Sequence, residues 1–193
     1  MPTITTPFGQ RRVLGATGCL VALAAAATAC ADGAQTGGPG PQAADKAPIV
    51  GLVDFGDMSR DHVPGTVDYE QIPPVGGAHS GESLQNCGFY STPVQDEYAV
   101  HSLEHGAVWI TYSPDLPAGQ ADGLRTFAES GDHVLVSPYD GLPSPVVASA
   151  WGLQLRLDSA DDDRLEAFVS QFAEGPQTPE PGAPCDGGAG VPE

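Results

Sequence analysis

Basic residues are scarce in this sequence, in which lysine and arginine together number 7 against 25 aspartate and glutamate residues. Two of the seven are Arg11 and Arg12, and every acidic residue lies after Cys30. A chain that begins at Cys30 therefore carries a formal charge of 5 − 25 = −20. Nucleic acids and anionic lipid headgroups bind cationic surfaces, so this charge argues against both as partners.

Several motifs of known chemistry are also absent. The sequence has no G-x-S-x-G nucleophile motif, no glycine-rich phosphate loop, no C-x-x-C pair and no internal repeat. These absences argue against the nucleophilic, phosphate-binding and dithiol chemistries for which such motifs are typical.

Long apolar runs are confined to the N-terminus. Residues 13–29 are uncharged, follow Arg11 and Arg12, and end in small residues directly before Cys30. This pattern is typical of a secretory signal peptide, and at about 17 residues the run is at the lower limit for spanning a bilayer. The small residues before Cys30 resemble a lipobox, so we expect a signal peptide over 1–29 and a lipid on Cys30. A plain signal peptide with an unrelated cysteine is the alternative, and Sec export is favoured over the twin-arginine route.

Composition divides the rest of the chain into three parts. Residues 30–48 contain no large apolar side chain and are expected to form a flexible tether. Residues 49–174 have the size of one globular domain, and 175–193 form a tail rich in proline and glycine. We expect the domain to lie at the extracytoplasmic face of the cell membrane, with the lipid anchor as its membrane contact.

Two cysteines, Cys87 and Cys185, lie beyond the expected lipidation site. Cysteine pairs in an oxidising compartment usually form disulfides, and a loop of roughly 100 residues could stabilise the fold by about 4 kcal/mol. Such a bond would also hold the proline-rich tail against the domain. The alternative is that Cys87 serves as a metal ligand or a reactive thiol.

Regular structure is expected only in the second half of the domain, because residues 50–94 are dense in glycine, proline, aspartate and serine. Helices are predicted over 96–105, 117–130 and from 159 or 161 to 174, and strands over 107–112, 133–136, 146–151 and 153–157. These elements predict an α+β domain with a small mixed or antiparallel sheet of three to four strands, two packing helices and a long irregular N-terminal loop region.

Four of the five histidines lie between residues 62 and 105. His101 and His105 are four residues apart, which places both imidazoles on one face of a helix, and His79 follows a flexible Gly-Gly-Ala turn. We therefore predict a divalent-metal site, for zinc or copper, formed by these three imidazoles. His62 or Glu104 is expected as the fourth ligand or as a partner that orients an imidazole.

Two other interpretations of the histidines remain open. Residues 101–105 spell H-x-x-E-H, the inverted zinc-peptidase pattern, in which Glu104 would activate a metal-bound water. Gly106 and a predicted strand follow at once, so the helix that this chemistry requires is short. Alternatively, the histidines only form hydrogen bonds that brace the irregular backbone, the role we also expect for His133.

An ordered set of short motifs resembles a known family. The motifs are His62-Val63, Val67-Asp68-Tyr69, Pro73-Pro74, Gly77-Ala78-His79, Cys87-Gly88-Phe89-Tyr90, Val100-His101-Ser102-Leu103-Glu104-His105-Gly106, Pro145-Val146-Val147 and Ala150-Trp151-Gly152. Together they resemble domain of unknown function 3105, found largely in secreted or membrane-anchored bacterial proteins. The resemblance runs from about residue 61 to residue 180. It implies no activity, but it implies that five residues occupy motif positions of the family: His62, His79, His101, Glu104 and His105.

Overall fold

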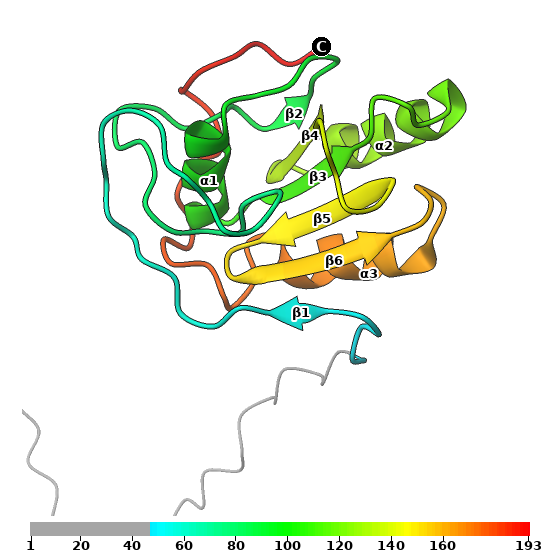
Figure 1. Ribbon diagram of the computed structural model, residues 1–193, viewed down its shortest axis with the longest axis horizontal. Helices are drawn as coiled ribbons and strands as arrows, with labels where there is room; N and C mark the ends of the chain where they lie inside the picture. The colour runs from blue at the N-terminus through cyan, green and yellow to red at the C-terminus, as the bar shows by residue number, and fades with distance from the viewer. Residues whose placement is uncertain (1–46) are drawn as a thin grey trace, which may run out of the picture. The chain divides into compact units, whose positions relative to one another are not determined.

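A six-stranded sheet organises the computed structural model, which describes residues 47–193 (Figure 1). Its strands are β1 (Val53–Asp54), β2 (Gly88–Phe89), β3 (Val108–Tyr112), β4 (Val134–Pro138), β5 (Val146–Ala150) and β6 (Leu153–Leu157), in the order β1-β6-β5-β3-β4-β2. The helices are α1 (Asp96–Glu104), α2 (Ala118–Ser130) and α3 (Asp163–Phe172). Strand β4 pairs in parallel with β2 and β3, and the other pairs are antiparallel.

The predicted sheet of three to four strands with two packing helices was wrong, because the sheet has six strands and three helices pack on it. The two additional strands, β1 and β2, are two residues long and lie at the two edges of the sheet. A strand of two residues has no alternation to detect, since its pattern needs at least four residues. Both strands also lie in the segment that was expected to be irregular.

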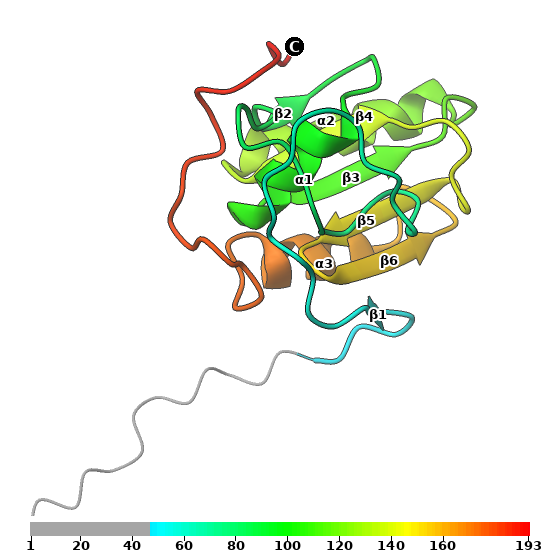
Figure 2. The same ribbon diagram turned by 60° about the vertical axis from the view of Figure 1, so that its left-hand side comes forward.

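Helices cover both faces of the sheet. On one face, α2 and α3 pack through Leu124, Leu165 and Phe168 against one set of alternating strand residues, such as Ile110. On the other face, α1 packs through Leu103 against Trp109 and Leu135 (Figure 2). Successive strand side chains point to opposite faces, so a strand buried on both sides must be apolar throughout, as β3 and β4 largely are.

Helix α3 begins at Asp163 and its N-cap is Asp162, one residue after Asp161 and three after Ser159, the two predicted caps. The Asp162 carboxylate accepts a hydrogen bond of 3.0 Å from the backbone N–H of Arg164, which satisfies one of the free donors of the first turn. The carboxylate also pairs with the Arg164 guanidinium at 2.6 Å, and these contacts hold the pKa of Asp162 below its usual value.

We expect Asp162→Ala to lower the free energy of unfolding by about 1 kcal/mol, because the helix loses its N-terminal cap. Urea unfolding followed by circular dichroism measures this change. Asp161→Ala is the matched control, since the Asp161 side chain is exposed and makes no cap contact, and it should leave the midpoint nearly unchanged. Equal effects of the two substitutions would contradict the capping role.

The irregular segment before α1 is held on the α1 face of the sheet by specific hydrogen bonds. The amide of Gly152 donates to the carbonyl of Val75 at 2.7 Å, and the buried Gln154 side chain donates to the carbonyl of Pro73 at 3.0 Å. The Glu97 carboxylate on α1 accepts from the backbone of Val67 at 2.8 Å. A loop of this length is therefore ordered by partners distant in sequence, which positions its histidines relative to α1.

The C-terminal segment, residues 175–193, is attached to the rest of the domain by a disulfide. Cys87 and Cys185 are bonded, as predicted, which leaves no thiol at Cys87 for metal binding or catalysis. Backbone hydrogen bonds from Asn86 to Ala189 and from Glu193 to Phe89 extend this attachment to the last residue.

Candidate metal site

Helix α1 provides two of the four side chains that come together. Asp96 and Glu97 lie in its first turn, where the helix dipole favours negative charge. The helix ends before Gly106, whose φ of +100° and close approach to Thr178 leave no room for a side chain. His101 and Glu104 are three residues apart, so they lie on one face of the helix.

Two loop segments provide His62 and His79. They form an isolated parallel bridge in which the amide of Val63 donates to the carbonyl of His79 at 2.8 Å and the amide of His79 donates to that of Asp61 at 3.0 Å. The backbone reaches this position through Gly77, whose φ is +107°, a conformation that L side chains rarely adopt. The two imidazoles therefore have a defined backbone support although neither lies in a regular element.

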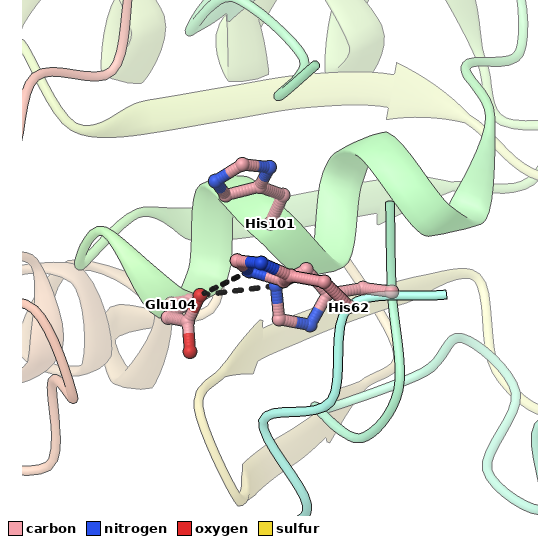
Figure 3. Close-up of side chains that lie close together, drawn as sticks. His62, His101 and Glu104 are labelled. Carbon is pink, nitrogen blue, oxygen red and sulfur yellow. Dashed lines mark hydrogen bonds and ion pairs between the residues drawn. The ribbon is translucent and has the colours of Figure 1, made fainter. Parts of the chain in front are cut away.

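The four side chains converge on one point. Each of His62, His79, His101 and Glu104 offers one donor atom, and no two of these atoms are further apart than 4.8 Å. The Glu104 Oε2 atom lies 3.0 Å from Nε2 of His79 and 3.5 Å from Nε2 of His62 (Figure 3). Donor atoms on one zinc ion lie roughly 3 to 3.5 Å apart, because each bond is about 2.0–2.2 Å long. The Glu104 distances already match this spacing.

The hydrogen bond at Nδ1 selects the tautomer of the neutral His79 ring. Nδ1 lies 2.9 Å from the Gly77 carbonyl, which can only accept a hydrogen bond, so Nδ1 carries a proton. In the neutral imidazole Nε2 then presents a lone pair, and that lone pair points toward the Glu104 carboxylate. Both side chains are almost completely buried, at 0% and 3% exposed. Two facing lone pairs that are buried away from solvent require a cation or a proton between them.

His101 has a different environment. Burial lowers the pKa of His101, and the neighbouring His105 and His79 lower it further, while the Ser83 backbone and Glu104 act in the opposite direction. Its buried Nδ1 atom has no hydrogen bond of ordinary geometry. The neutral imidazole is therefore favoured at His101, and neutral imidazole is the form that binds metal ions.

His105, predicted as a third imidazole of the site, lies outside the group of four. Its Nδ1 donates to the carbonyl of Pro184 at 2.7 Å, and its Nε2 lies 3.5 Å from the Glu180 carboxylate. Its ring faces the C-terminal segment, although it remains 4.7 Å from the His101 ring between centroids. The peptidase pattern needs both histidines of H-x-x-E-H on one ion, and this arrangement does not provide that.

His133, like His105, forms a hydrogen bond with the C-terminal segment. One ring nitrogen donates to the carbonyl of Ala183 at 2.9 Å, and the other lies 3.7 Å from the Glu174 carboxylate.

Two features of the site were missed at the sequence level. The Trp151 ring packs edge-on against His79, with ring centroids 5.9 Å apart, and Gly81 lies directly beneath the His62 ring. Trp151 was expected as the end of a strand and as part of the Ala150-Trp151-Gly152 motif, without a contact to the histidines. A single glycine between Ser80 and Glu82 gives no distinctive signal in the sequence.

The expected signal peptide (1–29), Cys30 and the tether as far as residue 46 lie outside the residues that the structure describes. Among residues 47–193, no helix has both the length and the apolar character needed to cross a bilayer.

A family model described as "Protein of unknown function (DUF3105)" matches residues 62–187, a span that contains all four converging side chains and both bonded cysteines. The chain belongs to this family. The resemblance inferred from the short motifs is thus confirmed. No curated protein and no solved structure gives a significant match to the chain. The site is therefore interpreted from its own chemistry.

Proposed function

We propose that this DUF3105 protein binds one divalent transition-metal ion, zinc or copper, through His62, His79, His101 and Glu104. The observation that carries the proposal is the orientation of His79. Its Nδ1–H is held by a backbone carbonyl, and its Nε2 faces a buried carboxylate oxygen at 3.0 Å. Metal-binding histidines characteristically have their second nitrogen fixed by such a carbonyl or carboxylate.

The donor set supports the choice of metal class. Three imidazoles and one carboxylate suit zinc, copper and nickel better than calcium or magnesium, which prefer ligands made only of oxygen. Soft ligands are missing from the group of four, so copper would be expected in its divalent form. The strongly negative chain also favours the approach of cations.

We further propose that a lipid on Cys30 holds the domain at the outer face of the cell membrane. The support lies in the N-terminal pattern, in which a charged start and an apolar run end in small residues before Cys30. A disulfide between Cys87 and Cys185 agrees with an oxidising compartment. Metabolic labelling with a fatty acid and its loss in Cys30→Ser test this part of the proposal.

Elemental analysis and titration with zinc or copper test the metal site. The purified protein should hold about one equivalent of ion, and His101→Ala should weaken binding by more than about 100-fold. His105→Ala is the matched control on the same helix and should stay close to the parent, because His105 faces the C-terminal segment. Equal affinity of the parent and His101→Ala would remove the site.

A second candidate function is structural. A proton in place of a metal ion would turn the 3.0 Å contact between His79 and Glu104 into a buried ion pair that braces the loops on α1. In that case neither parent nor variant binds metal, and the histidine variants lose stability whether or not an ion is supplied.

A further inference from the structure

The four proposed ligands differ sharply in their access to solvent. The side chains of His79 and Glu104 are 0% and 3% exposed, whereas that of His62 is 51% exposed. His101 is intermediate, with its Nδ1 atom buried. An ion bound here would therefore be shielded by three more buried side chains, and His62 would be its most solvent-exposed ligand.

The position of His62 depends on a glycine. A Cβ atom at Gly81 would lie 2.8 Å from both Cβ and Cγ of His62 and 2.9 Å from its Nδ1, distances that real Cβ atoms essentially never show. Gly81 does not have a positive φ, so its backbone conformation is open to alanine, and only the space beneath the imidazole requires glycine. Any larger residue at position 81 must displace the His62 side chain.

We propose that His62 is an exchangeable ligand and that the ion enters and leaves the site by replacement of this imidazole. An incoming donor with an imidazole or carboxylate group, from another metal-binding molecule, takes the coordination position of His62. One bond between the ion and His62 Nε2 breaks and one bond to the incoming donor forms, with no change in oxidation state. Gly81 is a positioning residue for this ligand. This inference rests on the proposed metal site.

The remaining contacts of His62 agree with a ligand that can move. Its ring touches the other donors, at 3.5 Å to Glu104 Oε2 and at centroid distances of 4.8 Å to His79 and 5.5 Å to His101. His79, by contrast, is fixed by the Gly77 carbonyl and by the ring of Trp151. Release of His62 therefore leaves the other three donors in place to hold the ion until the incoming molecule takes it.

Transfer of zinc from the loaded protein to the chromogenic chelator 4-(2-pyridylazo)resorcinol tests the inference. In the parent the transfer rate should rise with chelator concentration, because the chelator replaces His62 on the ion. His62→Ala and Gly81→Ala should each transfer zinc at least about tenfold faster. Gly119→Ala is the matched control, because a Cβ there meets nothing within 4 Å, and it should behave as the parent.

The His62→Gly/Gly81→Ala double variant removes the steric conflict, including the contact with Cβ of His62, and should transfer zinc at the rate of His62→Gly alone. A further acceleration in the double variant would overturn the positioning role of Gly81, even if Gly81→Ala alone does not fold. The exchange mechanism would be overturned, with the metal site intact, if the transfer rate of the parent did not depend on chelator concentration. The same conclusion would follow if the Gly81→Ala variant folded and transferred zinc at the parent rate. A parent that binds no zinc overturns both.

Discussion

Glu104→Gln should abolish the stabilisation of this protein by metal ions. An ion that binds only the folded state stabilises it by about 2.7 kcal/mol when its free concentration is 100 times the dissociation constant. Urea unfolding of the parent with zinc should show a shift of this size relative to the same protein with a chelator. In Glu104→Gln the two curves should nearly coincide.

We expect this loss because one oxygen atom of Glu104 lies close to two of the three imidazoles. Glu104 Oε2 is 3.0 Å from Nε2 of His79 and 3.5 Å from Nε2 of His62, so it is close to both imidazoles. Glutamine has nearly the same shape but lacks the negative charge, and its amide N–H₂ can donate to the lone pair of His79 that the ion would use. The variant should therefore keep the fold and lose the ion.

Glu180→Gln is the matched control, since Glu180 is a half-exposed carboxylate that contacts His105. It should show the same zinc-dependent shift as the parent. An undiminished shift in Glu104→Gln would contradict the assignment of Glu104 as a ligand.

The metal-free curves separate the two candidate functions. Breaking a buried ion pair by removing one partner costs about 3–5 kcal/mol, because the other charge stays buried and unpaired. If His79 and Glu104 form such a pair, Glu104→Gln loses this stability in the presence of chelator, and the parent shows no zinc-dependent shift. If they bind metal, the larger difference between parent and variant is the one seen with zinc.

The longer elements could be predicted from sequence because each carries its own signal. Strand β3 is a continuous run of β-branched and aromatic residues that ends before Ser113-Pro114, and α3 has apolar residues on one face after an acidic first turn. Strands β1 and β2 have no such signal, since hydrogen bonding to β6 and β4 alone defines them. These partners lie far away in the sequence, which is why the width of the sheet was underestimated.

The same distinction applies to the site. The spacing of residues 101, 104 and 105 shows that α1 could present either Glu104 or His105 together with His101. The choice depends on the C-terminal segment, because Pro184 and Glu180 engage His105. Such contacts cannot be derived from local spacing. The approach of His62 and His79 likewise depends on the bridge between their loops.

Removal of the disulfide should strongly lower the stability of the fold. Cys87→Ala/Cys185→Ala should lower the free energy of unfolding by about 2–5 kcal/mol, because the bond restricts an unfolded chain between residues 98 positions apart. Urea unfolding under oxidising conditions measures the loss. Reductant should reproduce it in the parent and have no effect on the double variant, and a parent insensitive to reductant would contradict the prediction.

The disulfide and the proposed metal ion join different parts of the chain. The ion would connect His62 and His79 to α1, whereas the disulfide connects the strand β2 region to the C-terminal segment. Independent constraints of this kind should have additive effects, so the double cysteine variant should keep the zinc-dependent shift of the parent within about 0.5 kcal/mol. The C-terminal segment does contact α1, since the amide of Glu180 donates to the carbonyl of Glu104. A much smaller shift in the cysteine variant would therefore show that this segment, held by the disulfide, positions Glu104 for the ion.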